Sequence, residues 1–293
     1  MQENEVLYER PAHYIPRIAA VHDLCGYGKC SLGVAIPVLS AAGCDVCPVP
    51  TGLFSSHTAF PGWYMHDTTA ILPDYLKAWS GIGVELDAIY SGFLGDTAQV
   101  DIIGGLYTDY PKALRVVDPV MADHGKVYPT YTPELCAAMG RLAAKADILT
   151  PNLTEASILL GIEWPGEDIT DAKAEEMVRN LLALGAKNVI LKGIHRAGEN
   201  VVRNFVGSFD ENGNLQLTQV QNDYLPYALH GTGDVYCSCV MAAVMAGKNC
   251  IEAADFAGKF VHAAIEISTK QPEFQARGVS FEPLLGQVSD LLK

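Results

Sequence analysis

The sequence has little positive charge and no long apolar run. Its 293 residues include 20 lysines and arginines against 34 aspartates and glutamates, which gives a formal net charge of −14. A chain this acidic, without a block of basic residues, does not favour general binding to nucleic acid or to an anionic membrane. No segment approaches the ~18 unbroken apolar residues of a membrane-spanning helix, and residues 1–17 lack the apolar centre of a signal peptide. We therefore expect a cytoplasmic globular protein.

The sequence also lacks a paired metal-binding cysteine pattern. Its one Cys-x-x-Cys lies at 44–47, and no second pair stands at the spacing of a zinc site. The flanking residues indicate a strand that follows a helix, where cysteine serves as a small apolar residue. We expect the eight cysteines to be reduced thiols of the core rather than metal ligands.

Two familiar phosphate-binding motifs are absent as well. The stretch GYGKCS (26–31) resembles part of a Walker loop, but Asp23 and Cys30 stand where that motif needs glycine and a hydroxyl residue. The dinucleotide fingerprint fails because its third glycine would fall on Ser31. The segment remains a glycine-containing turn between a strand and a helix, so it can approach a ligand closely.

What the sequence does contain is an alternation of short β-rich runs and longer helical patterns. The runs predict strands at 15–22, 44–50, 86–92, 114–120, 146–152 and 188–193. The helical patterns lie at 31–42, where Pro37 is expected to cause a bend, and at 96–108, 132–144, 153–160, 170–185, 234–246 and 251–269. This order favours an α/β fold with an open, mostly parallel sheet covered on both faces.

One segment departs from the alternation. Asn212-Gly213 separates two alternating runs within 201–220, which predicts a β-hairpin. No linker, low-complexity tract or internal repeat interrupts the chain. We expect one domain over 15–293, preceded by a flexible segment at 1–14.

Polar residues gather where five of the predicted strands end. Ligands of open α/β sheets bind outside the carboxyl ends of the strands, so this pattern predicts a ligand site. The alternative is that these residues belong to ordinary polar loops. The residues are His22, Asp23, Ser91, Gly92, Asp118, Asn152, Lys192 and Gly193.

The stretch HGTGD (230–234) places two glycines and a carboxylate directly before an apolar helical run. Asp234 is the only charged residue between Asp223 and Lys248. Glycines at a helix start let backbone N–H groups converge on an anion, which the positive helix end also favours. A carboxylate at the same point fits phosphoryl transfer, because it can orient the attacking hydroxyl group and accept its proton. The alternative is an aspartate that caps an ordinary helix.

With these motifs in place, residues 15–270 resemble the pyridoxal kinase branch of the ribokinase-like superfamily. The resemblance is carried by GTGD (231–234), DPVMADHGKVY (118–128), TPNLTEASILLG (150–161), FSSHTAF (54–60) and VILKG (189–193). It implies a three-layer α/β/α sandwich with a mostly parallel central sheet and the hairpin near 201–220. It also implies ATP-dependent phosphorylation of the 5′-hydroxymethyl group of pyridoxal, pyridoxamine or pyridoxine.

The resemblance implies roles for the residues that match the motifs. Asp234 would be the catalytic base that deprotonates the hydroxymethyl group. The anion hole for the γ-phosphoryl group would consist of Gly231, Thr232 and Gly233. The substrate-binding positions would be Thr58, His57, His22, Asp23 and Phe93. For His57 the alternative is a loop histidine with purely structural hydrogen bonds.

Further matching residues are expected around the nucleotide. These are Asp118, Asn152, Glu155, Lys192 and Gly193. Asp118 and Glu155 would handle Mg²⁺, directly or through water, because hard carboxylate oxygens suit this ion. Asp123 is a further candidate, either for holding its loop or for a monovalent cation such as K⁺. For Lys192 the alternative is a solvated lysine at a strand end. Family members are usually homodimers, so the resemblance also implies a homodimer that binds a B6 vitamer and ATP.

The sequence departs from the family pattern near the expected substrate. Val21 replaces a common serine, Ala59 replaces a glycine, and Phe93 replaces an aromatic residue that often carries a hydroxyl group. The stretch HDLCGYGKCSLG (22–33) is also similar to hydroxymethylpyrimidine (phosphate) kinases of thiamine synthesis, which form the main alternative. A vitamer-binding protein without turnover is a second alternative, although such a protein would not need the base.

Overall fold

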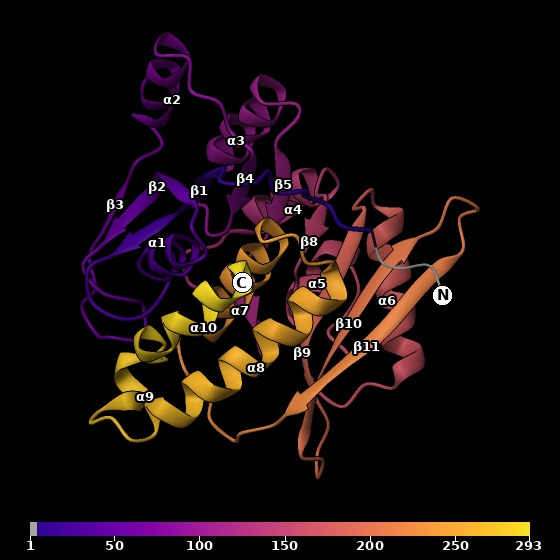
Figure 1. Ribbon diagram of the computed structural model, residues 1–293. Coiled ribbons are helices and arrows are strands. Elements are labelled where there is room, and N and C mark those ends of the chain that lie inside the picture. Colours follow the sequence, from indigo (N-terminus) through magenta and orange to yellow (C-terminus); the bar gives the residue numbers. More distant parts are fainter. Residues whose placement is uncertain (1–4) are drawn as a thin grey trace.

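A nine-stranded sheet forms the centre of the computed structural model, which describes residues 5–293 (Figure 1). Residues 1–4, the first part of the segment expected to be flexible, lie outside the described residues. The strand order is β11-β10-β9-β8-β5-β4-β1-β2-β3. The strands are β1 (Arg17–Cys25), β2 (Asp45–Phe54), β3 (Met65–Asp67), β4 (Ala88–Ser91), β5 (Leu114–Val117), β8 (Ile148–Leu149), β9 (Asn188–His195), β10 (Val201–Phe209) and β11 (Leu215–Asp223).

The sheet is mostly parallel, as the alternation predicts. The neighbours from β2 through β1, β4, β5 and β8 to β9 all pair in parallel. At one edge β10 and β11 form an antiparallel hairpin whose turn contains Gly213 at φ 79°. At the other edge β3 pairs antiparallel with β2. The predicted α/β class and the hairpin at 201–220 are confirmed.

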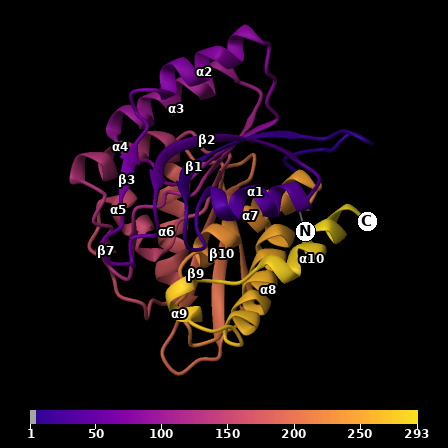
Figure 2. The same ribbon diagram turned by 90° about the vertical axis from the view of Figure 1, so that its left-hand side faces the viewer.

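Helices cover both faces of the sheet, which explains why its central strands are continuous apolar runs. One face packs against α2 (Leu72–Gly81), α3 (Thr97–Asp109), α4 (Pro133–Ala143), α5 (Leu153–Leu160) and α6 (Asp171–Ala183). The other packs against α1 (Leu32–Ala41), α7 (Thr232–Met245), α8 (Cys250–Ser268) and α10 (Leu285–Ser289). Figure 2 shows the sheet between these two layers. The predicted three-layer sandwich is therefore the observed architecture.

Helix α7 is the most deeply placed of these helices. Every residue from Val235 to Met245 is buried, because α1 and α8 cover the sides of α7 that the sheet does not. This burial accounts for the long apolar run after Asp234. The N-terminal end of α7 alone reaches solvent, where residues 231–234 are partly exposed.

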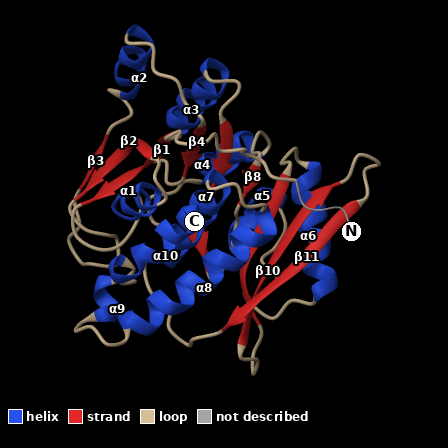
Figure 3. Ribbon diagram, in the orientation of Figure 1, coloured by secondary structure: helices blue, strands red, loops and turns tan. Residues whose placement is uncertain are grey.

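Several short elements were not predicted from the sequence (Figure 3). They include β3 and α2, and a small two-stranded ribbon of β6 (Ala122–Asp123) and β7 (Lys126–Val127). Near the C-terminus lie α9 (Phe274–Arg277), α10 and two short 3₁₀ turns at Glu282–Leu284 and Asp290–Leu292. Apart from the ten-residue α2, these pieces of two to five residues carry too few residues to show a hydrophobic period.

All eight cysteines are free thiols. Cys237 and Cys239 on α7, Cys250 on α8 and Cys44 belong to the core of one face, and Cys25 and Cys136 belong to the core of the opposite face. Cys30 and Cys47 are half-buried and pack against the second of these cores. Their placement among apolar side chains is the one expected for cysteines that serve as small apolar residues. No helix within residues 5–293 combines the length and the apolar character that crossing a membrane requires.

Arg10 fastens the N-terminal segment to the end of α1. Its guanidinium donates hydrogen bonds to the carbonyls of Ala42 at 2.8 Å, Gly43 at 2.7 Å and Tyr14 at 3.1 Å. The Tyr14 hydroxyl in turn donates to the Asp87 carboxylate at 3.0 Å. A cation at the C-terminal end of a helix satisfies carbonyls that have no partner within the helix.

Replacement of Arg10 by alanine is expected to lower the free energy of unfolding by roughly 1–3 kcal/mol, because three carbonyls lose a charged donor. Turnover should stay at the wild-type value, since α1 places Arg10 about 15 Å of helix away from the β1–α1 turn. Urea unfolding measures the free energy of unfolding, and steady-state kinetics measure the turnover. Arg179→Ala is the control, because Arg179 makes only an exposed ion pair with Glu175 and should change stability by at most about 0.5 kcal/mol. Equal losses in both variants would contradict the capping role of Arg10.

Candidate active site

The predicted polar strand ends meet at one edge of the sheet. Strands β1, β4, β5, β8 and β9 are successive neighbours and run parallel, so their carboxyl ends lie side by side. Beyond β8 and β9, Asn152 and Lys192 pair in an isolated parallel bridge. The strand order thereby gathers residues that lie far apart in the sequence, and the N-terminus of α7 adjoins them.

The turn before α7 can adopt its shape only with glycine. Gly231 has φ 83°, and a Cβ there would lie 1.8 Å from the carbonyl oxygen of Lys29. Thr232 stabilises the turn by donating its hydroxyl to the Leu229 carbonyl at 3.0 Å. The first N–H groups of a helix have no partner within the helix, so this turn presents donors and a positive helix end. We call residues Gly231–Asp234 the anion turn.

Asp234 lies on the first turn of α7, and the pKa of its carboxyl group is raised. Burial raises the pKa of its carboxyl to about 7, and the nearby Asp118 carboxylate adds to this rise. A carboxyl group with a pKa near neutrality is well suited to take a proton from a hydroxyl group. The geometry is consistent with the base expected from the sequence.

Asp118 and Lys192 form a buried ion pair beside this carboxylate. Burial opposes the charge on Lys192, but the Asp118 and Glu155 carboxylates outweigh it and raise the lysine pKa. The Thr150 hydroxyl donates to Asp118 Oδ1 at 3.2 Å, whereas Asp118 Oδ2 is buried without a hydrogen-bond partner among the described residues. Lys192 is only 8% exposed, which excludes the alternative of a solvated strand-end lysine.

Glu155 ties the loop after β5 to the start of α5. Its carboxylate accepts the N–H of Asn152 at 2.8 Å and the N–H of Met121 at 3.3 Å. The Asn152 side chain accepts the N–H of Glu155 at 2.9 Å, which completes a capping box. Burial raises the pKa of Glu155 to about 8. Glu155 therefore has a structural task in addition to any role toward a metal ion.

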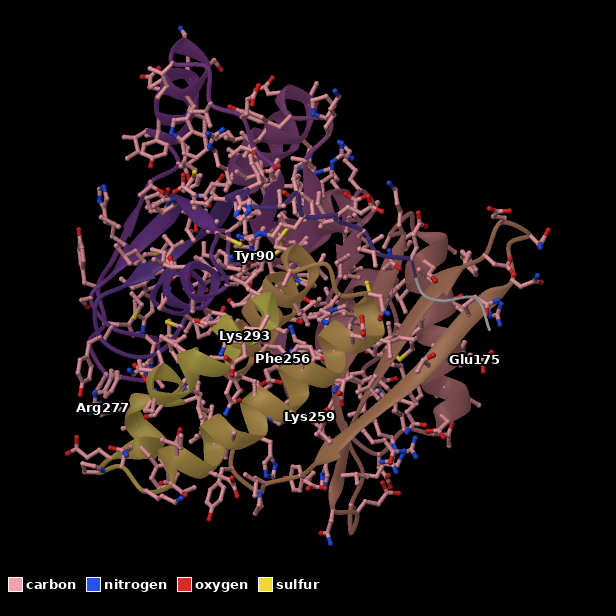
Figure 4. The ribbon with its side chains drawn as sticks, in the orientation of Figure 1. Tyr90, Glu175, Phe256, Lys259, Arg277 and Lys293 are labelled. Atoms are coloured by element: carbon pink, nitrogen blue, oxygen red, sulfur yellow. The ribbon has the colours of Figure 1, made fainter. Side chains whose placement is uncertain are left out.

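His57 on the loop that follows β2 lies against the anion turn. Its ring stacks on the ring of His230 at a centroid distance of 4.5 Å, and its Nε2 lies 2.9 Å from the Ala276 carbonyl oxygen. The backbone of His57 also donates to the Tyr27 carbonyl at 3.1 Å. Thr58, the next residue, is exposed. The loop between β2 and β3 (residues 55–64), which we call the substrate-side loop, thus contacts the β1–α1 turn on one side and the C-terminal segment around α9 on the other. Figure 4 labels Arg277 in that C-terminal segment.

His22 and Phe93 occupy the core directly beneath this edge. His22 is fully buried, its ring packs edge-on against Tyr90 at 4.3 Å, and neither ring nitrogen has a partner among the described residues. Burial lowers the pKa of His22 to about 3, so the ring is neutral. Phe93 packs against Phe54 and Tyr131, both at 5.6 Å. A direct contact of either residue with a substrate stays a prediction.

The remaining predicted residues lie at different depths. Asp23 is buried, and its carboxylate accepts the Ser31 hydroxyl at 2.5 Å. Gly193 has φ 75° and donates its N–H to the Asn204 side chain at 2.9 Å. Asp123 lies on the β6–β7 ribbon, exposed to solvent, 3.6 Å from His124. Asp123, Thr58 and Gly193 are therefore the members of the predicted set that the structure leaves exposed.

Three residues of the site were missed from the sequence. Thr150 donates to Asp118, His230 stacks on His57, and Ser31 donates its hydroxyl to Asp23. Thr150 is the first residue of the TPNLTEASILLG stretch and His230 is the first residue of HGTGD, so their place in these stretches was the available signal. Ser31 could not be identified in this way, because the identity of a serine does not indicate that its backbone has a positive φ, here 53°.

The donor set of the site fits a magnesium ion better than a transition metal. Within residues 5–293 no group of three or more histidine, cysteine or acidic side chains is arranged to hold a metal. Mg²⁺ typically takes one or two carboxylates and completes its shell with waters and substrate phosphates. The unpartnered Asp118 Oδ2 is a carboxylate oxygen of the kind this ion binds.

A family comparison covers most of the chain. The family model described as phosphomethylpyrimidine kinase matches residues 40–278. This range includes the substrate-side loop, the loop after β5 and the anion turn.

Individual relatives are similar over nearly the whole length. A Bacteroides thetaiotaomicron protein assigned as a phosphomethylpyrimidine kinase, crystallised with pyridoxal, is 34% identical, with a TM-score of 0.88 over 94% of this chain and 96% of that one. The pyridoxal kinase of Lactobacillus plantarum is 27% identical, with a TM-score of 0.83 over 95% and 98%. Pyridoxal kinase PdxY of Pseudomonas entomophila is 28% identical over 84% and 86% of the two chains.

Proposed function

We propose, because the chain belongs to the phosphomethylpyrimidine kinase family, that it phosphorylates the 5′-hydroxymethyl group of a B6 vitamer with ATP as the donor. The observation that carries the proposal is Asp234 on the first turn of α7, with a pKa of about 7 beside the glycine turn. The vitamer class is supported by relatives named pyridoxal kinase and by the related structure with pyridoxal.

Two parts of the anion turn have different roles in the proposed reaction. The ionised form of Asp234 accepts the proton of the hydroxymethyl group as its oxygen attacks the γ-phosphoryl group. The N–H groups of residues 231–233 stabilise the negative charge that builds on the transferring group. Because the pKa of Asp234 is near 7, a large fraction of the carboxyl groups is ionised at neutral pH.

The buried pair of Asp118 and Lys192 would face the triphosphate. Asp118 would hold Mg²⁺ through Oδ2, with Glu155 acting through water because both its oxygens already accept backbone N–H groups. The ion when bound neutralises charge on the phosphates. Lys192 keeps Asp118 ionised and would contribute its own charge toward the nucleotide. A requirement for K⁺ and a homodimeric state belong to the same proposal, and titration with KCl and light scattering measure them.

A second candidate substrate is hydroxymethylpyrimidine or its phosphate. It is favoured by the description of the matching family and by the absence of a serine hydroxyl at Val21, a buried β1 position. The reaction and the base would be the same, and only the ring would differ. The two candidates therefore differ in specificity rather than in mechanism.

A substrate panel tests the proposal. The purified protein, ATP and Mg²⁺ are offered pyridoxal, pyridoxamine, pyridoxine and hydroxymethylpyrimidine in parallel, and products are detected by mass spectrometry. We expect phosphorylation of the pyridines well above that of the pyrimidine. Preferential turnover of the pyrimidine would move the function to the second candidate, and an absence of product from all four would contradict both.

A further inference from the structure

Strand β9 carries one extra residue where it reaches the candidate site. Its pairing with β10 is regular up to Leu191 and resumes at Ile194 with the register shifted. Lys192 and Gly193 of β9 therefore lie opposite a single residue of β10, Asn204, and this arrangement is a β-bulge. Bulges redirect side chains and are frequent next to active sites.

The bulge changes the face of the sheet toward which β9 directs its side chains. Leu191 and Ile194 are three residues apart, and such residues point to opposite faces of a regular strand. Both nevertheless pack in one core cluster, whereas Ile190 packs in the cluster of the other face. Lys192 and Gly193 thus absorb the extra residue, and Gly193 does so with φ 75°. The course of the backbone at Lys192 is therefore set by the bulge.

Both neighbouring strands hold the bulged residues. On the side of β8, the Lys192 N–H donates to the Pro151 carbonyl at 2.9 Å. On the side of β10, the Gly193 N–H donates to Asn204 Oδ1 at 2.9 Å, so a side chain takes the place of a strand carbonyl. From the backbone held by these two bonds, the Lys192 side chain reaches Asp118. The Asn204 amide consequently helps to fix the direction of the lysine.

The Asn204 amide is itself enclosed. Asn204 is 2% exposed, and its Nδ2 lies 3.5 Å from Oδ1 of Asn222, a buried residue of β11. Helix α8 leaves room for the Asn222 amide through Gly258, where a Cβ would lie 1.8 Å from Asn222 Oδ1. Buried amides retain the orientation that gives them partners. The nitrogen of Asn204 therefore faces Asn222, and its oxygen faces Gly193.

We propose that Asn204 is a positioning residue that closes the β9 bulge and thereby sets the direction in which Lys192 presents its ammonium group to Asp118 and to the nucleotide phosphates. Without the amide oxygen, the Gly193 N–H would lose its partner, and the register of β9 would no longer be fixed at this point. Lys192 would then shift relative to Asp118. The inference rests on the proposed function, since it requires Lys192 to face the triphosphate.

Asn204→Ala removes the amide and is expected to raise KM for ATP roughly 10-fold, a loss typical when a group that orients a site residue is removed. KM for the vitamer should stay close to wild type, because the change lies on the nucleotide side. Calorimetric titration with MgADP should show the same loss of affinity without turnover. Ser208→Ala, at the other end of β10, is the control with unchanged kinetics. Wild-type KM for ATP, or equal increases in both KM values, would overturn the positioning role.

A pair of glycine substitutions tests the bulge without removing a buried amide. Gly193 and Gly198 have φ of 75° and 80°, and a Cβ at either would meet no atom within 4 Å. Alanine therefore adds similar backbone strain at both positions. Only Gly193→Ala strains the bulge, so it should raise KM for ATP, while Gly198→Ala, in the loop between β9 and β10, should leave it unchanged. The same KM for ATP in both variants would contradict the inference.

Asn204→Ala is finally combined with Lys192→Met. A residue that acts through Lys192 adds no further loss once the ammonium group is gone, whereas an independent structural defect multiplies with it. We expect KM for ATP of Lys192→Met/Asn204→Ala to equal that of Lys192→Met. Full multiplication of the two losses would overturn the positioning role alone. Wild-type KM for ATP and wild-type MgADP affinity in Lys192→Met would instead overturn the role of Lys192 in the proposed function.

Discussion

Asp234→Asn is expected to lower kcat by roughly 10²–10⁴-fold, the contribution typical of a positioned general base. Asparagine has the shape of aspartate, so the geometry of the site should persist. It cannot take a proton from a hydroxyl group. The loss should therefore appear in kcat while the vitamer and the nucleotide still bind, which isothermal titration calorimetry measures.

The pH dependence supplies an independent signature of the same base. The pKa of Asp234 is raised to about 7, so the ionised form is lost as the pH falls through neutrality. Wild-type kcat is therefore expected to rise with pH up to about 7 and then to level off, and this limb should vanish in Asp234→Asn.

The same shift predicts the effect of the substitution on stability. A carboxyl whose folded pKa lies above its unfolded value destabilises the folded state as the pH rises through that interval. Asp234→Asn should accordingly be at least as stable as wild type at pH 7 to 8. Asp109→Asn, at an exposed position near the end of α3, is the control for the pH dependence of kcat and for the stability. Turnover at the wild-type rate with an intact pH limb would exclude Asp234 as the base.

Gly231→Ala is expected to lower kcat/KM by at least about 100-fold, because a displacement near 1 Å at a catalytic turn has that consequence. A Cβ at Gly231 would lie 1.8 Å from the Lys29 carbonyl oxygen, which is backbone and cannot rotate away. The φ of 83° adds strain for any residue with a side chain. Either the start of α7 or the turn carrying Ser31 must therefore move.

The structure offers a matched control two residues along the same turn. A Cβ at Gly233 would meet no atom within 4 Å, and its φ is ordinary. Gly231→Ala should lower the free energy of unfolding by roughly 1–3 kcal/mol, whereas Gly233→Ala should leave it within about 0.5 kcal/mol. Urea unfolding of the two variants decides the point, and equal stability of both would show that the turn tolerates a side chain at Gly231.

The sequence predicted the layers of the fold because hydrophobic period and turn residues are local signals. The helices at 153–160 and 251–269 and the hairpin at Asn212-Gly213 all follow from such signals. The order of the strands is not local. That β1 lies beside β4 and β5 beside β8 depends on packing between distant segments, which a single sequence does not display.

Within the candidate site, too, features that are local in the sequence were predicted and features that join distant segments were not. Asp234 and its glycines were found because they are contiguous, and five strand ends were found because each follows an apolar run. The pairing of Asp118 with Lys192 was not found, since 74 residues separate them. The full burial of His22 was also not predicted, because a histidine at the end of a strand is expected to be accessible to solvent. Gly92 makes that burial possible, since a Cβ there would lie 2.2 Å from His22 Nδ1.

The burial of α7 has a consequence for how the molecule moves. An element enclosed on all sides opens only when much of the domain unfolds, so its amide hydrogens exchange slowly with solvent. Asp234 is mounted on the solvent-facing end of that element, while the substrate-side loop around His57 is held by a few hydrogen bonds and one ring stack. A local opening of this loop should therefore cost far less free energy than any movement of the base.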